Sequence, residues 1–133
     1  MSEENCEHSK LPPGKFCWQE LLTPDAEAAK AFYGRVFGWG ASEMDMGDFV
    51  YHMFEQDGEP VAGMIEITPE MQGAVPCWMS YVAVADADAA LSEAIAAGGN
   101  AIKGVTDIPG KGRFAVVVDP TGAVISFWQN TET

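Results

Sequence analysis

The sequence predicts an α+β fold built from two similar modules, each with a strand, a helix and about three further strands (βαβββ). The length of 133 residues fits one ordinary domain. Short aromatic segments alternate with two Ala-rich amphipathic segments, a pattern typical of strands and helices in one domain. The order of these segments also repeats once along the chain.

The composition indicates a globular and strongly acidic chain. Hydrophobic residues make up 47% of it and charged residues 20%, which are globular values. Its 20 Asp and Glu residues against 7 Lys and Arg residues give a formal net charge of −13. This charge argues against nucleic acid as a partner, because phosphate binding needs clustered Lys and Arg. It also argues against an anionic membrane surface, which attracts basic segments.

The cysteines and the N-terminal residues favour a cytoplasmic location. Cys6, Cys17 and Cys77 are an odd set, which indicates free thiols in a reducing compartment. Residues 1–8 are acidic and polar, so they do not resemble a signal peptide. No segment approaches the ~18 apolar residues that a membrane-spanning helix needs.

Polar and proline-rich stretches divide the chain into four segments. Residues 1–14 end in Leu-Pro-Pro-Gly, which predicts a loose tail. Prolines bound a second polar stretch at 69–76, which predicts a linker. The two modules are therefore predicted at 15–68 and 77–129, and together they form one compact domain.

The first module begins with a short, apolar and aromatic strand at 16–23. Thr23-Pro-Asp25 predicts a helix start, because Pro and acidic residues favour the first turn. Apolar residues at three- to four-residue spacing predict the helix over 26–36, which Gly38 ends. Further strands are predicted at 48–54 and 60–67.

The second module repeats this order. A strand is predicted at 77–84, and Asp86-Ala-Asp88 opens a second Ala-rich helix that Gly98-Gly99 closes. The remaining strands are predicted at 101–108, 113–118 and 123–128.

Individual residues repeat as well as elements. Cys17-Trp18 recurs as Cys77-Trp78, and Asp25-Ala26 recurs 61 residues later as Asp86-Ala87. Chance similarity between two Ala-rich helices is the alternative, but it would not reproduce the order of the strands. Each half exposes one face of a small sheet, so the halves bury these faces against each other or curl into a cleft between them.

Five segments carry a resemblance to a known family. They are Trp18-Gln-Glu-Leu-Leu-Thr-Pro-Asp25, Ala31-Phe-Tyr-Gly-Arg-Val-Phe-Gly-Trp39, Trp78-Met-Ser-Tyr-Val-Ala-Val84, Ile108-Pro-Gly-Lys-Gly-Arg113 and Asp119-Pro-Thr-Gly-Ala123. With these segments the chain resembles the vicinal oxygen chelate superfamily, which includes glyoxalase I, bleomycin-resistance proteins and extradiol dioxygenases. It is most similar to the glyoxalase-like branch, and the resemblance covers roughly residues 15–129.

The resemblance implies two paired modules, a curved mixed sheet around a cavity with the helices outside, and a homodimer. It also implies a divalent metal held by His and Glu, with ligands from the first and last strands of each module. In this sequence those positions fall on Trp18, Ala62, Met79 and Ser126. None of them is a usual metal ligand, so no cofactor is expected. A divalent metal held by other residues is the alternative.

Glu20 is the candidate catalytic residue. It lies two residues from Trp18, so the two side chains share one face of their strand. A carboxylate that faces a closed cavity is partly desolvated, which would raise its pKa and suit a general base. The alternative is a rim residue paired with Arg35 or a lysine. Gln19 and Glu66 are the other nearby residues that could coordinate a metal.

The predicted ligand-binding residues are Trp18, Glu20, Met79, Tyr81, Ser126 and Trp128. Trp18, Met79 and Trp128 would present the aromatic and soft surface that suits a flat or apolar small molecule. Tyr81 is the counterpart of Glu20 in the second module and could donate a hydrogen bond. The alternative for each residue is ordinary core packing. Trp78, next to Met79, should instead face the helix layer.

Other reactive side chains favour structural roles. His52 is a lone strand histidine, so neither a His-rich metal site nor a Ser–His–Asp arrangement is supported. Pro109-Gly-Lys-Gly-Arg113 could cap an anionic group, although a plain turn is favoured. Cys17 and Cys77 are expected to be small buried hydrophobes rather than nucleophiles.

The leading functional hypothesis is a glyoxalase/bleomycin-resistance-like protein that binds a small organic molecule in an inter-module cavity without the family's metal. The alternative is a lyase or isomerase that acts on a small oxygenated substrate and is related to lactoylglutathione lyase. In this hypothesis Glu20 is the general base, and the reaction runs with or without a metal. A third hypothesis is a structural module with a filled core. The expected partners are a small-molecule ligand and a second copy of the chain, with neither nucleic acid nor membrane.

Overall fold

The structure of the protein, a computed structural model, describes residues 12–47, 49–71 and 73–130. These residues form two compact units, Gln19–Trp78 and a second unit that joins 12–18 to 79–130. Most of the predicted tail, including Cys6, lies outside the described residues. Within the described part of the chain, no helix is long and apolar enough to cross a membrane.

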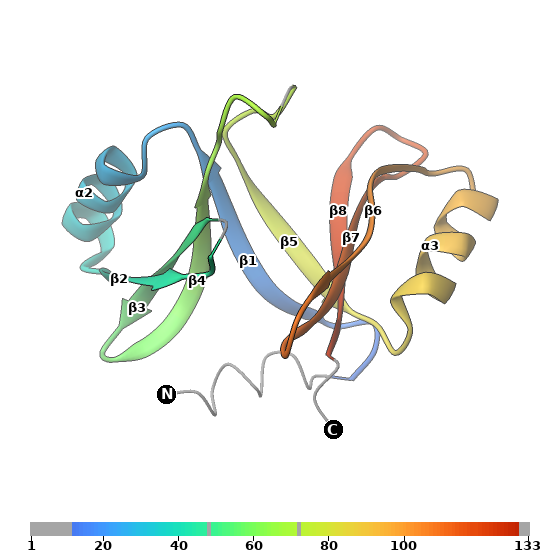
Figure 1. Ribbon diagram of the computed structural model, residues 1–133, viewed down its shortest axis with the longest axis horizontal. Helices are drawn as coiled ribbons and strands as arrows, with labels where there is room; N and C mark the ends of the chain where they lie inside the picture. The colour runs from blue at the N-terminus through green and yellow to red at the C-terminus, as the bar shows by residue number, and fades with distance from the viewer. Residues whose placement is uncertain (1–11, 48, 72, 131–133) are drawn as a thin grey trace. The chain divides into compact units, whose positions relative to one another are not determined.

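Each module contains a strand, a helix and three more strands, which confirms the predicted α+β class (Figure 1). The first module consists of β1 (Phe16–Thr23), α2 (Ala26–Phe37), β2 (Gly40–Asp45), β3 (Val50–Gln56) and β4 (Glu59–Glu66). The second consists of β5 (Cys77–Ala83), α3 (Ala87–Ala96), β6 (Asn100–Ile108), β7 (Gly112–Val118) and β8 (Val124–Asn130).

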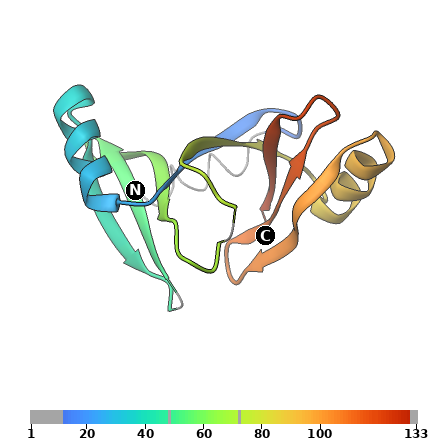
Figure 2. The ribbon, with the colours of Figure 1, turned by 90° about the horizontal axis from the view of Figure 1, so that it is seen from above.

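The strand order is equivalent in the two modules. It is β2-β3-β4-β1 in the first and β6-β7-β8-β5 in the second. The first strand of each module pairs in parallel with its last strand, and the neighbouring pairs are antiparallel. Within each module, the helix runs along one side of that module's strands (Figure 2).

Matching caps explain why both helices begin where they do. Asp25 accepts a hydrogen bond from the Ala28 N–H at 3.0 Å, and Asp86 accepts one from the Ala89 N–H at 3.1 Å. A carboxylate at this position satisfies a helix N–H that has no partner within the helix. Gly38 ends α2 in the left-handed region at φ 79°, which glycine adopts without strain.

A buried cluster beneath α2 defines the helix side of the first module. Leu21 of β1, Phe54 of β3, and Ala62 and Met64 of β4 pack together in this cluster. Successive residues of a strand point to opposite faces, so Glu20 lies on the other face, which neither of the two described helices covers. We call this surface the helix-free face of the module.

The second module repeats this division. Ala115, Val117 and Phe127 pack against Ala87 at the start of α3, and they form the helix side. Ser126 and Trp128 flank Phe127 in β8, so alternation places them on the helix-free face.

Candidate functional site

The helix-free face of the second module brings predicted ligand-binding residues together. Trp18, Phe114 and Trp128 pack against a buried cluster that includes Tyr81. The rings of Tyr81 and Phe114 lie edge to face, with centroids 6.3 Å apart. Tyr81 also pairs in register with Ser126, and Met79 precedes it by two residues on the same face of β5.

Two polar atoms on this face are buried without a hydrogen-bond partner in the described part of the chain. They are Oγ of Ser126, whose residue is 0% exposed, and Nε1 of Trp128. An indole N–H can only donate, whereas a hydroxyl can donate or accept. Each such buried group costs about 1–3 kcal/mol while it lacks a hydrogen-bond partner.

Gly112 leaves room for the Trp128 ring beside β7. A Cβ atom at this position would overlap the Trp128 ring and the main-chain carbonyl oxygen of Gln129. Gln129 in turn accepts the Ala87 N–H at 2.8 Å, which anchors the start of α3. A glycine inside a strand commonly marks such a close approach.

Glu20 lies on the helix-free face of the first module. Its residue is only 7% exposed, so its carboxylate is buried. Glu20 pairs in register with Gly63 of β4. The Tyr51 hydroxyl occupies the space where a Cβ of residue 63 would lie. Tyr51 is therefore a site residue that sequence reasoning missed, and the glycine within a strand was the available signal.

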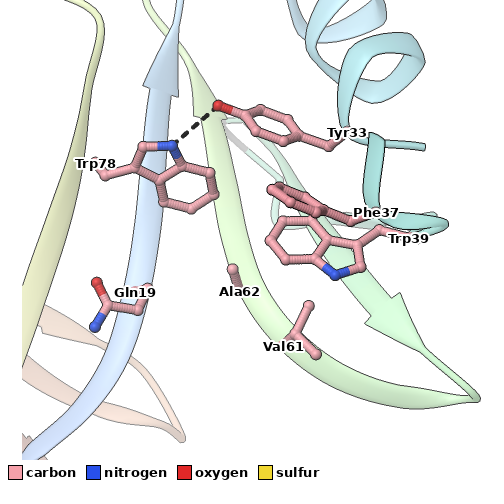
Figure 3. Close-up of a pocket in the computed structure, with 7 residues that line it drawn as sticks. All are labelled: Gln19, Tyr33, Phe37, Trp39, Val61, Ala62 and Trp78. Atoms are coloured by element: carbon pink, nitrogen blue, oxygen red, sulfur yellow. Dashed lines mark hydrogen bonds between the residues drawn. The ribbon is translucent and has the colours of Figure 1, made fainter. Parts of the chain in front are cut away.

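A separate pocket of about 430 Å³ opens on the helix side of the first module (Figure 3). It is lined by Gln19, Tyr33, Phe37, Trp39, Val61, Ala62 and Trp78. The Trp78 indole N–H donates to the Tyr33 hydroxyl of α2 at 3.0 Å. Trp78 therefore faces the helix layer, as predicted.

Comparison with known proteins identifies the family. The model of the glyoxalase/bleomycin resistance protein/dioxygenase superfamily matches residues 16–127. The chain belongs to this superfamily. A relative named "Putative glyoxylase CFP32", from Mycobacterium tuberculosis, is 38% identical over 115 residues, or 84% of this chain and 44% of the relative. The anthracycline biosynthesis protein DnrV of Streptomyces peucetius is 34% identical over 134 residues, or 91% of this chain and 49% of the relative. This chain therefore spans about half the length of these relatives.

Solved structures of the superfamily share the fold at low identity. The methylmalonyl-CoA epimerase of Streptomyces coelicolor, in complex with 2-nitronate-propionyl-CoA, has a TM-score of 0.60 and 14% identity over 90% of this chain and 99% of its own. The Mn(II)-bound glyoxalase from Novosphingobium aromaticivorans has a TM-score of 0.58 and 19% identity, over 90% of this chain and 40% of its own.

The superfamily's metal positions do not fit a divalent metal in this glyoxalase-superfamily chain. The assignment of the last-strand position of the first module to Ala62 is wrong, because Ala62 packs on the helix side. Gly63 pairs with Glu20 as Ser126 pairs with Tyr81, so Gly63 is the true counterpart of Ser126. The four positions then offer an indole, a thioether, a hydroxyl and no side chain, instead of carboxylate or imidazole.

The other two candidate metal ligands, Gln19 and Glu66, do not lie on the helix-free face of the first module. Among the described residues, no cluster of three or more His, Cys, Asp or Glu side chains could hold a metal ion. Gln19 lines the helix-side pocket. Glu66 accepts the Ala26 N–H of α2 at 3.1 Å, so its carboxylate also serves the helix side. Neither residue lies on the face that carries Glu20.

His52 and Arg113 lie beside carboxylates near the helices. His52 Nδ1 lies 3.9 Å from a Glu43 carboxylate oxygen, which Lys30 of α2 binds at 2.9 Å. Hydrogen bonding to Lys30 lowers the pKa of Glu43. The Arg113 guanidinium donates to Asp107 at 2.8 Å and to Asp88. Two carboxylates therefore neutralise Arg113, which supports a plain turn over an anion-binding loop.

The Cys17 thiol should react far more slowly than the Cys77 thiol. Burial raises the pKa of Cys17 to about 11, whereas Cys77 is partly exposed. Because the thiolate is the reactive form, only about 0.1% of Cys17 would be reactive at pH 8. We expect N-ethylmaleimide to modify Cys77 at least ~100-fold faster at pH 8. Peptide mapping by mass spectrometry measures both rates, and similar rates would contradict this prediction.

Proposed function

We propose that this glyoxalase-superfamily chain binds a small organic molecule on the helix-free face of its second module, without the superfamily's metal. The observation that carries the proposal is the buried pair of Ser126 Oγ and Trp128 Nε1, which lack hydrogen-bond partners in the described residues. Because the indole N–H only donates, the ligand would present an acceptor such as a carbonyl oxygen.

The aromatic surroundings support a flat ligand. Phe114 and Trp128 pack beside Tyr81, and aromatic surfaces of this kind favour stacking and edge-to-face contacts. A few polar groups set in such an apolar lining are typical of small-molecule sites. The net charge of −13 disfavours an anionic ligand, so a neutral aromatic carbonyl compound is the expected class.

Removing either polar partner should weaken binding of benzamide, a neutral probe of this class. We expect Ser126→Ala and Trp128→Phe each to raise the dissociation constant roughly 5- to 30-fold, the effect of losing one hydrogen bond to a buried partner. Isothermal titration measures this change. Ser42→Ala is the matched control, because Ser42 is exposed and bonds Glu55 in the first module. Equal binding of benzamide by the wild type, the two site variants and the control variant would contradict the proposal.

Metal independence has its own test. Elemental analysis of native protein should find no stoichiometric, tightly bound zinc, nickel, iron or manganese. A full equivalent of any of these metals would contradict the proposed ligand-binding mode, because it would require a donor set other than Trp18, Met79, Ser126 and Gly63.

The second candidate function is a lyase or isomerase reaction on a small oxygenated substrate. It is favoured by the buried Glu20 carboxylate and by the Tyr51 hydroxyl, which lies over the residue paired with Glu20. A carboxylate in this setting can accept a proton, and a phenol can donate a hydrogen bond to a developing oxyanion. The glyoxylase name of a 38% identical relative supports the hemithioacetal of methylglyoxal and glutathione as the first substrate to assay.

A further inference from the structure

We propose that the helix-side pocket of the first module is a second binding site, for a planar aromatic molecule without negative charge. The pocket lies between α2 and the strands and holds about 430 Å³ (Figure 3). Gln19 precedes Glu20 in β1, and Ala62 precedes Gly63 in β4. Successive strand residues point to opposite faces, so the pocket is on the opposite side from the Glu20 face. Its ligand would therefore not compete with one bound beside Glu20.

The rings that line the pocket present both faces and edges. Tyr33 stacks on Trp39 with centroids 5.7 Å apart and an interplanar angle of 26°. Trp78 stands nearly perpendicular to both, at 78° to Tyr33 and 81° to Trp39. A planar aromatic guest can stack on one ring and meet the edge of another in such a frame, which are the two preferred aromatic geometries.

The second module shows that the fold does not require these rings. Its equivalent pocket, of about 300 Å³ between α3 and the strands, is lined by Ala90, Ala94 and Ala97 among other residues. Ala94 stands at the position in α3 that Tyr33 has in α2, because both helices follow equivalent Asp caps. The same scaffold therefore packs its helix with alanine, and a single aromatic ring, Phe127, lines this pocket where four aromatic rings line that of the first module.

Two of the rings remain available to a guest. Phe37 is 53% exposed and Trp78 is 39% exposed, although both are large and apolar. The hydrogen bond from Trp78 to Tyr33 holds the indole ring in place while leaving its surface uncovered. Covering this surface with a ligand removes apolar area from water, which favours binding.

The uncharged pocket lining and the acidic chain determine which charge the ligand should carry. The seven lining residues include no charged side chain, and the whole chain carries −13. The negative potential disfavours anions, while the faces of Trp and Tyr attract cations. The pocket volume lies within the range of small-ligand sites, roughly 300–1,000 Å³. These observations favour a neutral or cationic planar molecule over an anionic one.

Proflavine, a planar cation, tests the proposal on the full chain. The four tryptophan indole N–H signals in a ¹H–¹⁵N spectrum report separately on the two sides, because Trp39 and Trp78 line this pocket and Trp18 and Trp128 pack with Tyr81. We expect proflavine to shift the Trp39 and Trp78 signals and to leave those of Trp18 and Trp128 in place. Shifts only at Trp18 and Trp128, or no saturable shift up to millimolar proflavine, would overturn the proposal.

Substituted proteins and a second ligand provide further tests of the same pocket. We expect Trp78→Ala to weaken proflavine binding at least tenfold and Tyr33→Phe two- to fivefold, whereas Ser42→Ala, at an exposed residue that does not line the pocket, should change it less than twofold. Amantadine, a cation without a planar ring, should bind at least tenfold more weakly than proflavine. Equal binding by Trp78→Ala and wild type, or equal binding of the two cations, would overturn the proposal. So would Trp39 and Trp78 signals that change with protein concentration alone, because a second copy of the chain would then occupy the pocket.

Discussion

Replacing Gly112 by alanine should destabilise the protein by about 2–4 kcal/mol, the upper range for overpacking a buried site. The new methyl group would overlap both the Trp128 ring and the carbonyl oxygen of Gln129. The carbonyl belongs to the paired strand β8, so it cannot move aside without disturbing the ladder between β7 and β8. Urea unfolding followed by circular dichroism measures the loss.

A matched glycine provides the control for this substitution. Gly104 lies in the neighbouring strand β6, and a Cβ atom there would meet nothing within 4 Å. Gly104→Ala should therefore change stability by less than about 0.5 kcal/mol. If Gly112→Ala unfolds at the same urea concentration as Gly104→Ala, the close packing of Trp128 over β7 is incorrect.

If the chain is an enzyme, Glu20→Gln should lower turnover by about two to four orders of magnitude, the usual contribution of a general base. The substitution keeps the shape of the side chain but removes its ability to take a proton. The substrate to use is the hemithioacetal of methylglyoxal and glutathione, and proton NMR in D₂O follows both product formation and deuterium uptake. Glu20 lies in a buried setting on the helix-free face, where a carboxylate of this kind can work away from bulk water.

The control for the Glu20 variant is Glu59→Gln in the same module. Glu59 is exposed at the start of β4, so its substitution should leave turnover unchanged. Wild-type turnover in the Glu20→Gln protein would reject the role of Glu20 as base. It would leave the proposed ligand site on the second module unaffected, because that site depends on Ser126 and Trp128.

The strands and helices that pack a core were predictable from local patterns. β1 spans the residues predicted for it, and both helices begin after the Asp residues that predict their starts. β2 (Gly40–Asp45) had no such pattern, because all six of its residues are exposed. Its position is fixed by pairing with β3, a long-range contact that apolar periodicity does not report.

The side chains of the candidate site were harder to place, because one residue of error turns a strand position to the other face. Counting back 64 residues from Ser126 led to Ala62, whereas the pairing of Glu20 with Gly63 shows that the equivalent position is one residue later. The two similar Cys-Trp pairs did not cause this error, because Trp78 was predicted to face the helix layer and Trp18 was not. Trp78 lines the helix-side pocket, while Trp18 packs with Tyr81.

Several predictions concern assembly, cellular location and ligand binding. The inter-module cavity, the homodimer and the cytoplasmic location stay predictions, as do the ligand roles of Trp18, Met79 and Tyr81. The position of Tyr51 was not predictable, because its hydroxyl lies over Gly63 of the neighbouring strand β4. Only the register of β3 with β4 reveals this contact. Such cross-strand contacts come from tertiary pairing rather than from local sequence.

The most direct test of the central claim is a benzamide titration of protein freed of metal with EDTA, followed at the Trp128 indole N–H signal. We expect a saturable downfield shift of this signal, because the buried N–H gains an acceptor. The dissociation constant should stay the same when Mn²⁺ or Zn²⁺ is added back. A Trp128 signal that stays in place without metal and moves only after Mn²⁺ or Zn²⁺ is restored would contradict metal-independent binding by this face.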